Sequence, residues 1–265
     1  MLFETHIKDN FIYLLDNYWC KAYFGGFTPG NMEGLKTQGI DIPRQISYDG
    51  RDYEVIEILN SALVCTYDLT FITIPDSIRR IGEYSLHRCS NKLKELVLPN
   101  SIKNIGEHAF DGCAALERVV LPQNLDIIPS HCFYSCGSLL NIVLPKKLLK
   151  IGDFAFYACE GLTNIDLPDS IVEIGNCAFA FCYGVKSFTL PKKLQYININ
   201  TFLQNPQIEK IISLNPTPPT IIKSKYDKFA INHYFKEAKL YVPKGSEHTY
   251  RNAEEWKEFK EIIGI

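Results

Sequence analysis

Cysteine is the residue type whose spacing most suggests chemistry. Five of the nine cysteines in this 265-residue chain recur at intervals of 23 or 24 residues, namely Cys89, Cys113, Cys136, Cys159 and Cys182. Thiolates could hold a metal or form a redox pair, but metal ligands must converge on one point, and a disulfide needs a particular twist about its S–S bond. Side chains repeated in register would instead point in parallel, about 4.8 Å apart. The spacing therefore favours a ladder of buried structural thiols, with Asn205 at the next position.

The remaining cysteines and the histidines give weaker evidence for a chemical site. Cys132 takes an alanine position of the pattern and is expected to be buried, whereas no shared register involves Cys20, Cys65 or Cys177. His108 and His131 occupy equivalent positions in adjacent copies and are expected to lie side by side. Two histidines without a carboxylate or a third ligand make a poor zinc site, so an ordinary pair on the convex side is favoured. We therefore predict no metal and no cofactor.

Catalytic and nucleic-acid motifs are missing from the sequence. It contains no G-x-S-x-G, no H-E-x-x-H and no phosphate-binding glycine loop. With 28 basic and 30 acidic residues, the charge balance gives no general reason to expect nucleic acid or an anionic membrane as partner. The Lys146-Lys147 and Lys192-Lys193 pairs are interpreted as solvated edges. No apolar run approaches the ~20 residues of a membrane span, and no export signal is recognised at the N-terminus. We expect a non-enzymatic protein that is cytoplasmic by sequence alone.

The elements that position these residues are repeats. Six copies align on a proline: Pro75, Pro99, Pro122, Pro145, Pro168 and Pro191. Each follows the pattern L-x-x-I-x-L-P-x-x-L-x-x-I-G-x-x-A-F-x-x-C-x-x, in which L-x-x-I-x-L alternates like a half-buried strand and the proline ends the strand. Because one repeat cannot bury its own apolar edge, the copies must stack, with their strands in a parallel sheet.

The second half of each copy is predicted to return as a helical turn. Four copies have glycine after the isoleucine, whereas the third has Pro129. Proline fixes φ near -65°, so this position does not require positive φ, and proline suits the first position of a helix. The A-F phenylalanines are predicted to form a buried spine: Phe110, Phe133, Phe156, Phe179 and Phe202, with Leu86 at its start.

The repeated LPxxLxxIGxxAFxxC pattern resembles the BspA-like, or Treponema pallidum type, leucine-rich repeat family over about residues 40–214. The segment GIDIPRQISYDGRDYEV is similar to the family's usual N-terminal segment, and NPTPPT with AKLYVPKGSEHTYRNAEEWKEF to the C-terminal cap of Bacteroidetes members. The resemblance implies an α/β repeat solenoid: a curved, right-handed coil with a parallel β-sheet on the concave face and short helical turns or extended segments on the convex face. It also implies a secreted or cell-surface location, as the alternative to the cytoplasm, and adhesion to host proteins or other cells.

Three regions are expected. Residues 1–39 should be an N-terminal cap of short strands, residues 40–214 the leucine-rich repeat solenoid, and residues 215–265 a C-terminal cap made of a strand and a helix. That helix should begin at the N-cap Ser246. Its apolar face should contain Tyr250, Ala253, Trp256 and Phe259.

The predicted function is a non-catalytic protein–protein interaction on the sheet face, with no nucleic acid and no membrane insertion. The final x of L-x-x-I-x-L points away from the core, which gives an apolar stripe of Val97, Val120 and Val143. A polar border of Glu95, Arg118, Asn141 and Asp166 would supply specificity, as interface cores and rims divide. The β-propensity of valine explains the stripe equally well. The alternatives are an enzyme or glycan-binding protein with its site in the caps, or a structural, self-associating protein.

Overall fold

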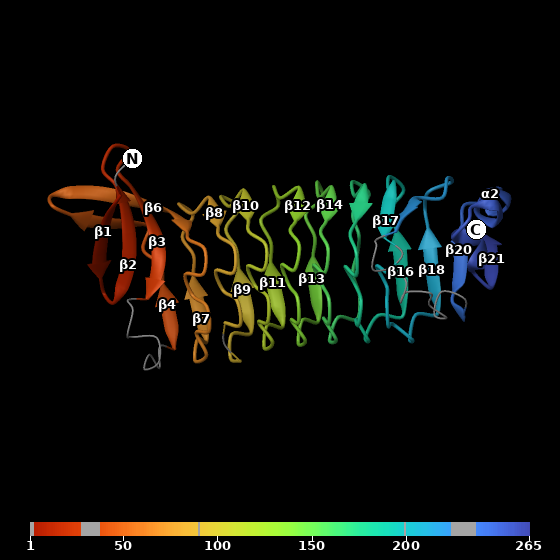
Figure 1. Cartoon of the computed structure of the whole chain (residues 1–265), viewed down its shortest axis with the longest axis horizontal. Helices are drawn as coiled ribbons and strands as arrows, with labels where there is room; N and C mark the ends of the chain where they lie inside the picture. Colours follow the sequence, from red (N-terminus) through yellow and green to blue (C-terminus); the bar gives the residue numbers. More distant parts are fainter. Residues whose placement is uncertain (1–2, 28–37, 90, 199, 224–236) are drawn as a thin grey trace.

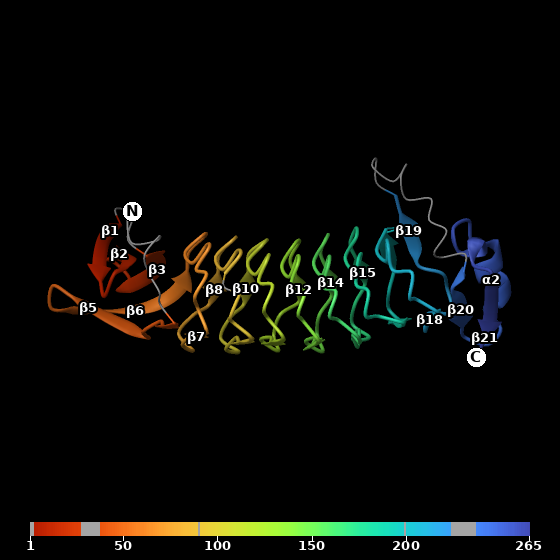
Figure 2. The same ribbon diagram turned by 90° about the horizontal axis from the view of Figure 1, so that it is seen from below.

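The computed structural model describes residues 3–27, 38–89, 91–198, 200–223 and 237–265. It is an elongated stack of β-coils with strand-rich segments at both ends (Figures 1 and 2). Two rows of short parallel strands run along the stack and enclose a single hydrophobic core. The predicted repeat solenoid is therefore observed, whereas the curvature and the right-handed sense of its coil stay predictions.

The first row of strands comes from the L-x-x-I-x-L segments, and we call its outer surface the sheet face. The row consists of β4 (Gly39–Asp41), β7 (Phe71–Thr73), β9 (Glu95–Val97), β11 (Arg118–Val120), β13 (Asn141–Val143), β16 (Ser187–Leu190), β18 (Lys210–Ser213), β20 (Lys239–Val242) and β21 (Glu261–Gly264). In β7, β9 and β13 the middle residue is buried and its two neighbours are exposed, as the alternation predicts. The row is not one continuous sheet: β9, β11 and β13 pair together, β16 begins a second sheet, and the intervening residues 164–166 form no strand.

The second row of strands follows the proline. Its strands come from the residue x and the isoleucine that precede the glycine position in each copy. It contains β8 (Arg80–Ile81), β10 (Asn104–Ile105), β12 (Ile127–Ile128), β14 (Lys150–Ile151), β15 (Glu173–Ile174), β17 (Tyr196–Asn198) and β19 (Thr220–Ile222). Within each sheet of this row, neighbouring strands pair in parallel, and the isoleucines stack in register. From β7 to β19, each coil except the one that contains residues 164–166 thus contributes one narrow strand to each row.

The return arm is not helical, which corrects the prediction of a helical turn. Five successive coils each hold two residues with left-handed backbone, four positions apart: Tyr84 and Arg88, His108 and Gly112, His131 and Ser135, Phe154 and Ala158, Cys177 and Phe181. A left-handed residue interrupts an α-helix. The arm therefore bonds to the next coil instead, with the Phe133 amide donating to the Ala155 carbonyl at 2.8 Å. The extended alternative for this face fits the structure better.

The glycine that precedes this arm is needed for space. Gly82, Gly106, Gly152 and Gly175 are not among the residues with positive φ, as the proline in the third copy indicated. A Cβ atom on Gly106 would lie only 2.4 Å from the amide nitrogen of Glu83 in the neighbouring coil. Glycine therefore lets successive coils approach closely at this point.

The phenylalanine spine is confirmed. The rings of Phe110, Phe133, Phe156 and Phe179 stack at centroid distances of 5.3, 5.4 and 5.4 Å, and Phe202 continues the column at 6.3 Å. All are buried, as is Leu86 at the start. One ring per copy therefore stacks along the length of the core.

At the N-terminal end, strands extend the second row. Strands β1 (Glu4–Lys8), β2 (Phe11–Asp16) and β3 (Lys21–Phe27) are antiparallel neighbours. Strand β3 pairs in parallel with β6 (Arg51–Ile58). Strand β6 also forms a hairpin with β5 (Gln45–Tyr48) and pairs in parallel with β8. This sheet closes the red end of the stack (Figure 1).

At the C-terminal end, the helix is shorter than predicted. Helix α2 (Glu247–Asn252) stops because Ala253 is extended, and a 3-10 turn (Trp256–Glu258) follows. Ser246 precedes α2 but makes no side-chain capping bond. Tyr250 and Trp256 are nevertheless buried: the Tyr250 hydroxyl donates to the Asn215 carbonyl at 2.7 Å, and the Trp256 indole N–H to the Pro219 carbonyl at 2.9 Å.

Candidate interaction surface

The valine stripe lies in one row on the sheet face. The backbone pairing places Val120 directly between Val97 and Val143. Val97 is 53% exposed and Val143 is 70% exposed, while Val120 between them is half-buried. Three β-branched side chains from successive coils thus present an apolar surface to solvent.

A polar row runs beside the stripe. Glu95, Arg118 and Asn141 are in register across β9, β11 and β13, and the Arg118 guanidinium pairs with the Glu95 carboxylate. Lys94 and Glu117 form a second ion pair across the same two coils, at 2.9 Å. Pairs as exposed as these contribute only about 0–1 kcal/mol to stability, so their charges stay accessible to a partner.

Asp166 does not join this row in the way the sequence suggested. It is exposed, but residues 164–166 form no strand, so the sheet stops at β13 before it resumes at β16. The predicted polar border is therefore brought together at Glu95, Arg118 and Asn141, and Asp166 lies in the segment that interrupts the row of strands.

Sequence reasoning missed two further apolar residues on this side. Phe71 on β7 and Leu140, three residues before Val143, are each 49% exposed. Both occupy x positions of L-x-x-I-x-L, where apolar residues have no core to fill. Phe71 shares its position with Glu95, which was expected to be polar, and Leu140 lies one position earlier in its copy, so an apolar residue at either position marks an exposed contact surface.

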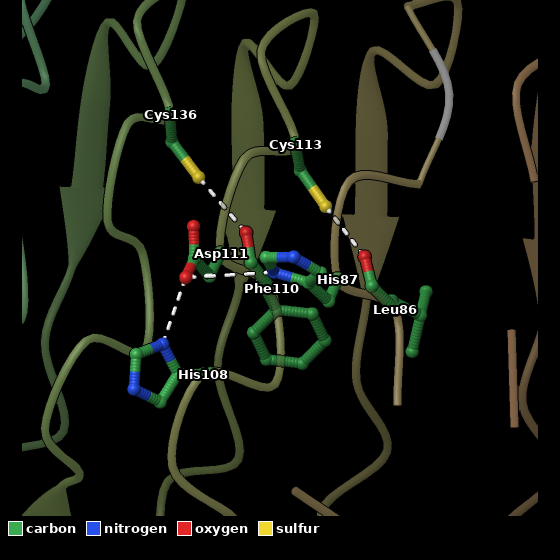
Figure 3. Close-up of polar contacts among 7 residues, drawn as sticks. All are labelled: Leu86, His87, His108, Phe110, Asp111, Cys113 and Cys136. Carbon is green, nitrogen blue, oxygen red and sulfur yellow. Dashed lines mark hydrogen bonds and ion pairs between the residues drawn. The ribbon is translucent and has the colours of Figure 1, made fainter. Parts of the chain in front are cut away.

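The cysteine ladder is internal and bonds one coil to the next. Four thiols donate to a carbonyl of the preceding coil. Cys113 donates to Leu86 at 3.2 Å and Cys136 to Phe110 at 3.3 Å (Figure 3). Cys159 donates to Phe133 at 3.2 Å and Cys182 to Phe156 at 3.1 Å. The Asn205 amide plays the same part toward Phe179 at 2.6 Å.

These thiols have structural rather than reactive surroundings. Burial, together with the neighbouring thiols, raises the pKa of Cys113, Cys136 and Cys159 well above that of a free thiol, and burial raises the pKa of Cys182 to about 12. Nucleophilic and metal-binding cysteines react as thiolates, so this ladder is poorly suited to either role. Cys132 is also fully buried.

The two histidines lie side by side, as predicted, but they are not isolated. The imidazoles of His108 and His131 stack with their centroids 4.2 Å apart. Asp111 Oδ2 lies 2.7 Å from His108 Nδ1 and 3.5 Å from His87 Nδ1, so one carboxylate joins histidines of two coils (Figure 3). The sequence signal was available, because His87 and Asp111 occupy equivalent positions of adjacent copies.

The comparisons with known proteins match these repeats. A family model described as BspA type leucine rich repeat region (6 copies) matches residues 56–160 and 126–234. The chain belongs to the BspA-type leucine-rich repeat family. None of the curated proteins compared with it matches its sequence.

Solved structures of leucine-rich repeat proteins share the fold. A leucine-rich repeat protein from Bacteroides ovatus is 22% identical, with a TM-score of 0.55, over 98% of this chain and 76% of that one. The T. pallidum leucine-rich repeat protein is 27% identical, with a TM-score of 0.51, over 83% of this chain and 85% of that one. The BspA-type repeat is consistent with a protein-interaction module.

Other candidate sites on this BspA-type chain are weaker. Within the described residues, no group of three or more histidine, cysteine or acidic side chains is arranged to hold a metal ion, and no helix has the length and apolar character of a membrane span. A polar cleft opens beside the second row, lined by Asp76, Arg79, Asn100, Ser101, Lys103, Asn104, Asn124 and Asp126. Its mixed charges give it no clear ligand class, whereas the sheet face has an apolar centre.

Proposed function

We propose that this BspA-type protein is a non-catalytic binding module that docks a protein partner on its sheet face. The observation that carries the proposal is the exposed row of Val97, Val120 and Val143, with Glu95 and Arg118 beside it. Apolar side chains clustered on a surface and bordered by polar ones are typical of interface centres. The family, whose repeat proteins are generally non-catalytic, supports the same proposal.

We propose further that the partner is a protein on another cell or in its surroundings. This step rests on the family resemblance and not on the geometry. Self-association through the same face is the competing outcome, because an apolar stripe on a C₂ axis could pack against its own copy.

The test compares two lysine variants in one coil. Val143→Lys places a charge on the sheet face, and Leu149→Lys places one on the opposite row, where Leu149 is 45% exposed. Both variants should unfold within a few degrees of the wild type, because neither side chain fills the core. Proteins captured from extracts of host or neighbouring cells by the wild type should be retained by Leu149→Lys and lost by Val143→Lys.

The outcomes separate the alternatives. Equal capture by both variants would remove the stripe from consideration. A dimer in light scattering that dissociates only in Val143→Lys would replace the outside partner with a second copy of this chain.

A further inference from the structure

Four rings at one repeat position form a column on the return arms. Tyr84, His108, His131 and Phe154 stack at centroid distances of 4.4, 4.2 and 4.8 Å, with interplanar angles of 10°, 14° and 16°. The backbone of each is left-handed, with φ of 54°, 56°, 57° and 56°. The register of the coils therefore places the two imidazoles face to face.

One carboxylate serves this column. The Asp111 side chain is only 13% exposed and lies beside His108 and His87, whose side chains are 20% and 22% exposed. Its Oδ2 atom is close to the Nδ1 atoms of both, so one positive charge in the cluster has a counter-charge (Figure 3).

A positive charge on His131 would lack the hydrogen-bonded carboxylate that His108 has. Its Nδ1 atom is buried and has no hydrogen-bond partner in the part of the chain that the structure describes. A protonated imidazole carries a donor on both nitrogens, and a buried donor without an acceptor is destabilising. The ring faces of His131 are covered by His108 and Phe154, so water has little access to them.

We propose that the stacked His108–His131 pair makes the solenoid acid-sensitive: a proton added to His131, whose ring is held between His108 and Phe154 and is not paired with Asp111, weakens the packing of the return arms. These return arms belong to the same coils as β9 and β11. The acid-sensitive histidines therefore lie in the coils that present Val97 and Val120 on the sheet face.

The direction in which the pKa of His131 is shifted agrees with the proposal. Burial lowers the pKa of His131, and the nearby His108 lowers it further, while Asp111, Glu107 and Asp153 act in the opposite direction. Tyr84 and Tyr134 are the other titratable rings packed against the pair. The Arg88 side chain is exposed.

The lowered pKa of His131 makes the stability of the fold depend on pH. A histidine whose folded pKa lies below its unfolded value of about 6.5 leaves the unfolded state binding more protons as the pH falls. The stability that His131 contributes is therefore present above pH ~6.5 and is lost as the pH falls through its folded pKa.

Urea unfolding of the full chain between pH 7.5 and 5.5 tests the inference. His131→Phe keeps a ring in the column, as Phe154 does in the next coil, but cannot titrate; His248→Gln removes an exposed histidine from the C-terminal helix instead. The urea midpoint of the wild type should fall with pH, that of His248→Gln should fall equally, and that of His131→Phe should fall less. Equal falls in the wild type and His131→Phe would overturn the inference.

Two further measurements guard the test. Asp111→Asn removes the counter-charge, so its midpoint should fall more steeply than that of the wild type; a shallower fall would contradict the part assigned to Asp111. If His131→Phe does not fold, NMR titration of the wild-type imidazoles decides, and a His131 resonance that titrates at or above about pH 6.5 would overturn the proposal.

Discussion

Replacing Ala158 with glycine should stabilise this protein, although alanine-to-glycine changes usually destabilise. Ala158 has φ of 54°, and Gly112 fills the equivalent position in another copy with φ of 72°. A left-handed backbone costs an L-residue roughly 1–2 kcal/mol, whereas glycine adds about 0.4–1 kcal/mol of unfolded-state entropy. The methyl group of Ala158 is partly exposed, so little packing is lost. The balance predicts a gain of about 0.5–1 kcal/mol, or roughly 1–4 °C in Tm for a chain of this size.

The assay is urea unfolding with a matched control. Ala114 is exposed and is not among the left-handed residues, so Ala114→Gly should cost about 0.4–1 kcal/mol. The reverse change, Gly112→Ala, should cost about 1 kcal/mol or more, because its Cβ would also lie 2.8 Å from Arg88 Cγ. If Ala158→Gly is destabilised as much as Ala114→Gly, the left-handed return arm is wrong.

Three other predictions concern the core and the C-terminal end. A thiol reagent should modify the exposed Cys20 first and Cys65 slowly, and should reach the seven buried cysteines only after denaturation; ladder disulfides found by mass spectrometry would contradict this. Phe133→Ala should cost about 3–5 kcal/mol in urea unfolding, since its ring is fully buried between two others, and a cost below about 1 kcal/mol would refute the spine. Deleting residues 215–265 should abolish cooperative unfolding or solubility, because an open sheet edge is left behind; a truncated protein with an unchanged melting temperature would show that this segment is an independent appendage.

Much of the fold could be predicted because each repeat position has one dominant physical demand. Alternating apolar residues before the proline could only be strands with one buried face, and Phe110 to Phe202 at constant spacing could only stack. The return arm was harder, because A-F flanked by Ile-Gly has the composition of a short helix. The left-handed conformation of Phe154 carries no sequence signal, because bulky aromatic residues rarely adopt positive φ. The helix at Ser246 was overestimated for a related reason: Tyr250, Trp256 and Phe259 keep helical spacing although the chain becomes extended at Ala253.

The candidate site, too, was predictable from the sequence only in part. The row of Val97, Val120 and Val143 follows from register alone, because parallel stacking places equivalent residues side by side. The Glu95–Arg118 pair could have been anticipated from the same register. The break in the sheet at Asp166 could not, since that coil keeps the repeat pattern and yet forms no strand. The carboxylate of Asp111 was not anticipated, although it follows His108 by three residues and occupies the position equivalent to His87 in the preceding copy.

Site-specific photo-crosslinking tests the central claim most directly. A benzophenone amino acid at position 143 reports contacts of the sheet face, and the same group at position 149 reports the opposite row of the same coil. A protein partner, mixed with the folded chain, should become covalently attached through position 143 and not through position 149. Attachment through position 149 alone, with position 143 unreactive in a properly folded variant, would contradict the assignment of the sheet face as the binding surface.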